Sequence, residues 1–108
     1  MSTARPPSDS LWASSPDDTI DAAFREFDRE HPEVFRLFRE YAESVRGRGF
    51  TRYSADAILH RIRWWHHVER GQTEFKINDH FSSRYARLLV SVDPSFAEFF
   101  EFRRLRRE

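Results

Sequence analysis

Several residue types are scarce in this sequence of 108 residues, which has no cysteine, three glycines and a single lysine. Without cysteine the chain can form neither a disulfide framework nor a thiolate metal site. A small, highly charged domain without disulfides suits a reducing cytoplasm. No apolar run approaches the roughly 20 residues that span a bilayer, and the segment MSTARPPSDS lacks the apolar stretch of a signal peptide. We therefore expect a cytoplasmic protein without a membrane partner.

The residue patterns of common catalytic and cofactor sites are also missing. Three glycines leave no phosphate-binding loop, and there is no GxSxG elbow for a nucleophilic serine. His60 and His67 would lie about 10 Å apart along a helix axis, too far to share a metal ion comfortably. Asp79-His80 lacks the second half of a metal-nuclease motif. We therefore expect a protein that is not an enzyme and that binds no metal or cofactor.

The apolar residues that are present are mostly aromatic, with eleven Phe, three Trp and three Tyr. A chain of this length forms one domain, which buries roughly 60–70 % of the surface of the unfolded chain. Residues 1–16 are rich in Ser and Pro, which predicts a disordered leader. Trp12 in this leader either docks on the domain or contacts a partner. Residues 17–108 are expected to form the single domain.

The net charge of zero hides a segregation of charge along the chain. Residues 1–45 hold five Arg against ten Asp and Glu, a balance of −5, and residues 46–108 hold thirteen Lys and Arg against eight Asp and Glu, a balance of +5. Such asymmetry indicates either a nucleic-acid-binding face beside an acidic one or two surfaces of one solvated protein. Arg outnumbers Lys seventeen to one, which is typical of bidentate phosphate or carboxylate recognition and equally of a GC-rich genome.

Apolar spacing and capping residues predict three to five helices. Asp17 or Asp18 can cap the first helix. His31-Pro32 ends it and begins the second, because Pro fits the first helical position, and Gly47 and Gly49 close the second. The remaining predicted elements are a Ser54-capped helix over about residues 55–70 that ends at Gly71, a strand over Glu74–Asn78, a Ser82-capped helix over residues 83–92 and a turn begun by Asp93-Pro94.

Together these elements predict a mainly helical α+β domain with a short antiparallel sheet, in a winged-helix-like order. The wing would consist of Phe50–Tyr53, Phe75–Asn78 and Phe99–Leu105. In the middle segment we expect Phe75 and Ile77 to face the core and Lys76 to face solvent. The twelve residues between the third and fourth helices are many for a helix-turn-helix turn, which counts against a DNA-reading motif.

The outer face of the predicted 83–92 helix has the composition of a recognition helix. At 100° per residue, Ser83, Arg84, Arg87 and Ser91 share one face, opposite the apolar stripe. Arg can bond guanine O6 and N7 in bidentate fashion, or it can bond a phosphate. Amphipathic helices on protein surfaces in general show the same pattern, so a merely solvated face is the alternative.

Two further basic segments fit contacts with phosphates. Asp56, His60, Arg63, His67 and Arg70 project away from the apolar arc of the 55–70 helix, and a row of cations can follow a phosphate backbone. The C-terminal run of Arg103, Arg104, Leu105, Arg106 and Arg107 can contact phosphates non-specifically. A solvated surface is the alternative for both segments, and an acidic partner is a further alternative for the C-terminal run.

Three segments resemble a family of short bacteriophage and prophage proteins. The segments are IRWWHHVE, FKINDHFSSRYARLLV and DPSFAEFFEFR, within Ile62–Arg103. The matching positions are Arg63-Trp64, Phe75–Asn78, Tyr85–Arg87, Pro94, Phe96, Phe99-Phe100 and Arg103. Asp79-His80 replaces an Asn run, and Ser82-Ser83 replaces a Thr-Pro cap, yet both replacements keep the ability to cap a helix. The resemblance implies a phage or prophage origin, hence the host bacterial cytoplasm, and it supplies no activity.

Two functions fit these observations. The first is a non-enzymatic accessory protein that binds double-stranded DNA, with Arg84 and Arg87 supported by Arg63, Arg70 and the C-terminal arginines. The second is a protein-binding module that inhibits or redirects a host or viral protein machine. It would act through the acidic Asp17–Glu43 half or through Trp64, which cannot face inward together with Trp65 and can serve as an anchor. The neutral net charge favours the second function mildly, and homodimerisation through surplus Phe is compatible with both.

Overall fold

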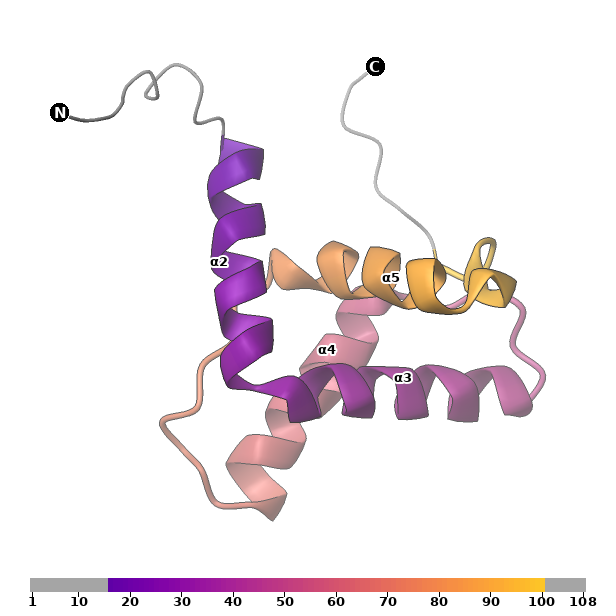
Figure 1. Cartoon of the computed structure of the whole chain (residues 1–108). Coiled ribbons are helices and arrows are strands. Elements are labelled where there is room, and N and C mark those ends of the chain that lie inside the picture. The colour runs from indigo at the N-terminus through magenta and orange to yellow at the C-terminus, as the bar shows by residue number, and fades with distance from the viewer. Residues whose placement is uncertain (1–15, 101–108) are drawn as a thin grey trace, which may run out of the picture.

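The computed structural model describes residues 16–100 and is mainly helical, as predicted. The helices are α2 (Pro16–Glu30), α3 (Pro32–Gly47), α4 (Ala55–Trp64) and α5 (Phe81–Val92). In Figure 1, α2 stands upright across one end of α3 and α5, and α4 crosses behind these two helices. α4 packs against both α3 and α5, and α2 packs against the same pair. Trp12 and the basic run from Arg103 lie outside the described residues.

The boundaries of α2 and α3 follow from local sequence. α2 begins at Pro16, so Asp17 and Asp18 lie inside the helix and the prediction that one of them caps it is wrong, and α2 and α3 meet at His31. Pro32 occupies the start of α3, where its missing N–H costs no hydrogen bond. α3 closes at Gly47, and Gly49 follows with a φ of 101°, a left-handed conformation that glycine adopts readily. The predicted break at His31-Pro32 and the glycine-rich end of α3 are therefore confirmed.

The helix predicted over residues 55–70 is present but changes its winding. The Ser54 hydroxyl accepts a hydrogen bond from the Ala57 amide at 3.2 Å, which confirms the predicted cap. α4 then runs directly into a π-helical turn, Trp65–Glu69, which sequence spacing did not indicate. Gly71, with a φ of 68°, follows this turn. Such turns within helices are frequent at functional sites.

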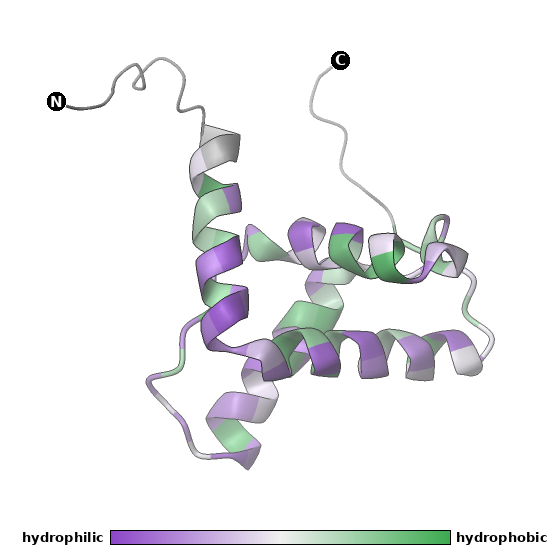
Figure 2. Ribbon diagram, viewed as in Figure 1, coloured by the Kyte–Doolittle hydropathy of each residue, from purple (hydrophilic) through white to green (hydrophobic). Residues whose placement is uncertain are grey.

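Aromatic rings make up a large part of the core of the described residues and contact one another in edge-to-face, stacked and tilted arrangements. Phe24 of α2 contacts Tyr85 of α5 with ring centroids 4.7 Å apart, and Phe38 of α3 lies 5.6 Å from Tyr85 on its other side. Phe100 extends this row from Phe38 at 5.6 Å. Hydrophilic and hydrophobic residues alternate around α3, as a helix with one buried face requires (Figure 2).

In place of the predicted antiparallel sheet, residues 16–100 contain a single bridge, which is parallel and joins Tyr53 to Phe100. The segment Phe75–Asn78 has no partner strand there. Its side chains still alternate as predicted, with Ile77 buried and Lys76 exposed. The carbonyl groups of Phe75 and Ile77 instead bond His67 of the π-helical turn and Arg63 of α4. The third wing segment extends beyond residue 100, outside the described residues.

The start of α5 differs from the prediction. The helix begins at Phe81, so Ser82 lies inside it and does not cap it. The Ser82 hydroxyl donates instead to the Asp56 carboxylate. The turn after α5 agrees with the prediction, because the Asp93 carboxylate accepts from the Ser95 amide at 3.1 Å and a short 3₁₀ turn, Pro94–Phe96, follows.

Candidate functional site

The segment Phe75–Ser82, which we call the strap, runs along α4 in the direction opposite to the helix. Its ends are held by Asp56 and His67. The Ser82 hydroxyl bonds the Asp56 carboxylate, and His67 Nε2 lies 2.7 Å from the Phe75 carbonyl oxygen. Because a carbonyl oxygen only accepts hydrogen bonds, His67 Nε2 carries the proton of this bond.

The middle of the strap is held by Arg63, a residue predicted to contact DNA. Its guanidinium donates to the Ile77 carbonyl oxygen at 3.1 Å and forms an ion pair with Asp79. His60 Nε2 lies 3.9 Å from the same carboxylate. The hydrogen bond and the charge of Arg63 lower the pKa of Asp79 below its ordinary value. The strip predicted to follow phosphates is therefore largely occupied by contacts with the strap.

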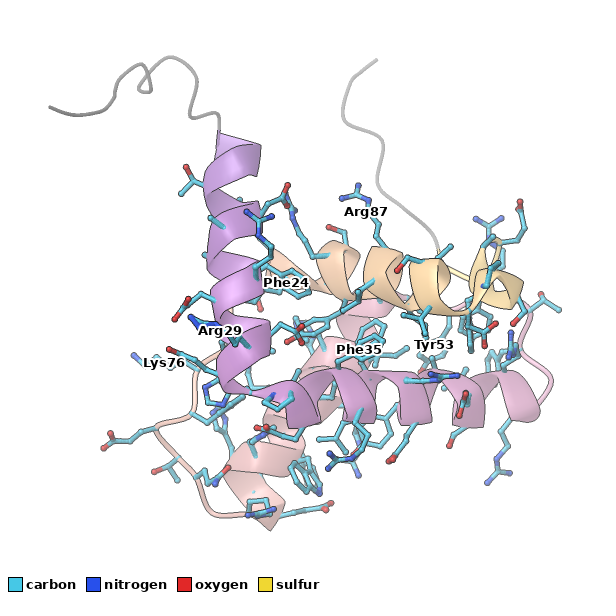
Figure 3. The ribbon with its side chains drawn as sticks, viewed as in Figure 1. Phe24, Arg29, Phe35, Tyr53, Lys76 and Arg87 are labelled. Atoms are coloured by element: carbon cyan, nitrogen blue, oxygen red, sulfur yellow. The ribbon has the colours of Figure 1, made fainter. Side chains whose placement is uncertain are left out.

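Arg84 is also engaged inside the molecule. Its Nε donates to the Asp21 carboxylate of α2 at 2.8 Å, and the arginine side chain is only 15 % exposed. Its Nη1 lies 3.4 Å from the neighbouring Ser83 hydroxyl. Arg87, one turn further along α5, is exposed and points away from α3 (Figure 3). Ser83, Arg84 and Arg87 thus lie close together as predicted, but Arg84 connects two helices.

The remaining predicted contact residues are dispersed. Arg70 is exposed, and its guanidinium lies 5.2 Å from the centroid of the Trp65 ring. Arg63, Arg70 and Arg84 therefore contact three different parts of the chain. The predicted residues Arg103, Arg104 and Arg106 lie outside the described residues.

The charge of α2 bears on any approach of DNA to α5. The sequence of α2 contains six Asp and Glu against two Arg, and α2 packs against α5. A phosphate backbone that approaches the first turns of α5 would meet this negative helix, and juxtaposed like charges oppose binding. The packing of α2 against α5 therefore favours DNA binding by α5 less than the sequence of α5 alone does.

A second surface, at the end of α4, is apolar and aromatic. Trp64 is 48 % exposed and Val68, one turn later, is 58 % exposed. The Arg61 guanidinium lies 4.7 Å from the Trp64 ring centroid and 5.5 Å from that of Tyr41 on α3. We call Tyr41, Arg61, Trp64 and Val68 the Trp64 surface. Arg61 also bonds Glu69 at 3.3 Å, so the cation that steadies the indole is itself held in place.

Two shallow grooves border the strap and the loop that precedes it, and neither was predicted from sequence. The first, of about 420 Å³, lies between the α2–α3 junction and this loop, and its lining residues are His31, Glu33, Gly71, Gln72, Thr73, Glu74 and Phe75. The second, of about 540 Å³, lies between α2 and the strap, and its lining residues are Ala23, Glu26, Phe27, Glu30, Lys76, Ile77, Asn78 and Phe81.

A buried histidine supports the first groove. His66 is 2 % exposed, and its ring stacks on that of Phe75 with centroids 3.7 Å apart. Its Nδ1 donates to the Ile62 carbonyl oxygen at 3.0 Å, so its Nε2 faces Glu33, whose carboxylate lies 3.7 Å away. His31 Nδ1 lies 3.5 Å from the same carboxylate. The spacing of four residues from Ile62 is the sequence signal that could have placed His66 on the buried face.

No family model, curated protein or solved structure matches this chain. Within residues 16–100, no three His, Asp or Glu side chains are arranged to hold a metal ion. No helix in that part of the chain is long and apolar enough to cross a membrane.

Proposed function

We propose that this protein is a protein-binding module that docks on a host or viral protein through the Trp64 surface. The observation that carries the proposal is the pairing of two large exposed apolar side chains, Trp64 at 48 % and Val68 at 58 %, on one side of a helix. Trp, Tyr and Arg are the residue types that contribute most to binding energy at protein interfaces. The Trp64 surface contains one of each.

The fixed geometry of this surface adds to its suitability. Arg61 lies over the Trp64 ring and bonds Glu69, which limits the conformations open to both side chains. A side chain that is already ordered loses less entropy when a partner binds, so more of the contact energy appears as affinity. The resemblance to short phage and prophage proteins makes a machine of the host or of the virus the expected partner.

Duplex DNA is the second candidate, and the exposed Arg87 on α5 is the observation that favours it. Arg84 is a poor residue for testing this function, because its loss would also separate α5 from Asp21 of α2. Replacement of Arg87, whose side chain is exposed, is the alternative test. If random-sequence duplex DNA binds with an affinity that falls steeply with salt and falls again in Arg87→Ala, the DNA function replaces the one proposed here.

Site-specific photocrosslinking tests the proposed function. A photoreactive residue is placed at position 68, and a control is placed at the exposed Ser44 of α3. In host lysate we expect one host or viral protein to crosslink at position 68 and not at position 44. Trp64→Ala should reduce the affinity of the chain for this crosslinked protein by roughly 30-fold, because a tryptophan at the centre of an interface contributes about 2 kcal/mol or more to binding.

The matched control is Phe50→Ala, since Phe50 is an equally exposed aromatic residue elsewhere on the surface, at 51 %. It should leave crosslinking at position 68 unchanged. Crosslinks that persist in Trp64→Ala would contradict the proposal. Crosslinks only to a second copy of the chain would also contradict it and would instead assign the Trp64 surface to homodimerisation.

A further inference from the structure

The two grooves meet at Phe27. The ring of Phe27 lies 4.6 Å from that of His31 and 6.1 Å from that of Phe75, both in the first groove. It lies 5.4 Å from the ring of Phe81 in the second groove. One half-buried aromatic side chain therefore separates the two grooves and touches residues of both, so a short peptide can reach both together.

The second groove offers an apolar floor. Ile77 is 8 % exposed and Phe81 is 3 % exposed, and together with Phe27 they form a surface for one aliphatic or aromatic side chain. The rim carries Glu26 and Glu30 on α2 and Lys76 on the strap. Glu26 is already paired with Arg29, so these rim charges nearly balance and the specificity of this groove is mainly apolar.

The first groove has a different character. Its acidic residues are Glu33 and Glu74, and neither Lys nor Arg lines it. The Glu33 side chain is 33 % exposed, so part of its carboxylate is accessible from solvent. The rings of Phe75 and His31 stand at its wall with centroids 5.6 Å apart. Carboxylates beside an aromatic face attract a guanidinium or ammonium group through both ionic and cation–π interactions.

The backbone of the strap offers a third point of attachment. The carbonyl groups of Phe75 and Ile77 bond His67 of the π-helical turn and Arg63 of α4. In an extended segment, neighbouring peptide groups point to opposite sides, which turns the N–H and C=O of Lys76 away from α4. Within residues 16–100 these two groups have no hydrogen-bond partner. An added peptide can pair with such groups, as in recognition by strand addition.

We infer that the two grooves form one docking site for an extended basic segment of a partner protein. An apolar side chain of that segment enters the groove lined by Phe27, Ile77 and Phe81, and an Arg or Lys side chain enters the groove of Glu33 and Glu74. Alternate residues of an extended peptide lie on one side about 6.6 Å apart. This spacing suits two grooves separated by a single ring, so the expected motif is an apolar residue followed or preceded by a basic one two positions away.

Charge complementarity selects this occupant over an acidic one. An acidic peptide or a nucleic acid would place negative groups against Glu33 and Glu74, where no Lys or Arg of the lining offsets them. This site is independent of the Trp64 surface, because its residues come from α2, the α2–α3 junction, the strap and the loop that precedes the strap, and none of them belongs to that surface. The two proposals can therefore fail separately.

A labelled peptide provides the test. The probe carries one leucine and one arginine two positions apart in a threonine background, and binding to the full chain is followed by fluorescence anisotropy. We expect saturable binding that is weakened about tenfold or more by Glu33→Gln and by Glu74→Gln, since each removes a charged hydrogen-bond acceptor. Glu40→Gln, at an exposed position of α3 outside both grooves, is the matched control and should bind as the original chain does.

Control probes and variants distinguish this docking site from other ways in which the peptide could bind. A probe with glutamate in place of arginine, and one with serine in place of leucine, should bind at least tenfold more weakly. Trp64→Ala should leave probe affinity unchanged. The inference is overturned if the probe fails to bind, if both glutamine variants bind it as well as the original chain, or if the glutamate probe binds equally. It is also overturned if the probe binds only after removal of residues 103–108, because the chain's own basic run would then be the occupant.

Discussion

At the scale of single residues, Tyr85 combines a closely packed ring with a buried hydroxyl group that has no hydrogen-bond partner within residues 16–100. Its ring is fully buried between Phe24 and Phe38. Burial raises the pKa of Tyr85, and the negative charges of Asp28 and then Glu33 raise it further. The side chain therefore stays neutral at pH 7.

Replacement of Tyr85 by phenylalanine tests how much free energy the burial of this hydroxyl costs. An unsatisfied buried hydroxyl costs about 1–3 kcal/mol, and the ring itself is kept. We expect Tyr85→Phe to raise the free energy of unfolding by about 1 kcal/mol, measured by urea denaturation at pH 7. A loss of stability of similar size would show that the hydroxyl makes a favourable contact after all.

At the scale of secondary-structure elements, the strap is the distinctive feature. Its first part, Phe75–Asn78, is extended and has no partner strand within residues 16–100, and the position of the strap depends on side chains of α4 and of the π-helical turn that follows α4. Four side chains at successive turns hold it: Asp56, His60, Arg63 and His67. The apolar contacts of Phe75 and Ile77 hold its other side against the core. Both grooves depend on this arrangement, because strap residues line them.

The ion pair of Arg63 with Asp79 makes the strap sensitive to acid. Because Arg63 lowers the pKa of Asp79 below the ordinary value of 3.8, the pair stabilises the fold fully above that value. The stabilisation is lost as the pH falls through the lowered pKa. We expect the original chain to be more stable than Asp79→Asn at pH 7 and the difference to vanish toward pH 2, in urea unfolding measured across this range.

A double-mutant cycle supplies the control for this experiment. In an Arg63→Gln background, Asp79→Asn should produce almost no pH-dependent difference, because the partner that lowers the pKa is gone. A difference that keeps its full size in that background would assign the effect to a group other than Arg63.

At the scale of the whole molecule, the placement of α2 decides the character of the surface. α2 stands across one end of α3 and α5 (Figure 1) and joins α5 through Phe24 in the core and through Asp21 with Arg84 at the edge. The acidic helix α2 therefore lies against the helix that carries Arg84 and Arg87. The charge segregation seen along the sequence becomes, in part, an internal pairing between elements.

Phe24 is the residue on which this placement depends most. Its ring contacts Phe81 at 5.5 Å and Tyr85 at 4.7 Å, and it is 8 % exposed. Truncation to Ala leaves a cavity, and such changes cost about 3–5 kcal/mol. We expect Phe24→Ala to lower the free energy of unfolding by that amount, whereas the exposed Phe50→Ala should change it by about 0.5 kcal/mol or less. Equal effects of the two variants would contradict the packing described for α2.

Local signals were enough to predict the helices. The Ser54 cap, the His31-Pro32 break and the Asp93-Pro94 turn act within a few residues and were all confirmed. The predicted Ser82 cap failed because Asp56, 26 residues away along the chain, takes the Ser82 hydroxyl. No partner strand for Phe75–Asn78 is seen within residues 16–100, where two of its carbonyl groups bond the side chains of His67 and Arg63 instead.

The candidate sites were less predictable, because helical spacing shows which side chains leave the apolar face but does not show what covers them. Arg63 leaves that face as predicted, yet it meets the strap. Trp64 was correctly placed off the buried arc, since two adjacent residues of a helix cannot both point inward. The grooves could not be predicted, because they arise where α2, the α2–α3 junction and the strap come together.

By itself, the sequence determined the helices, several of their ends, the aromatic content of the core and the exposure of Trp64, because these depend on spacing and capping within one or two helical turns. The tertiary structure alone decided which charged residues meet one another, and through them the strap, the grooves and the shielding of Arg84. Such pairings join segments that lie up to 63 residues apart along the chain. A charged side chain accepts any opposite charge that the fold brings within reach, so its partner is set by packing and not by its neighbours in the sequence.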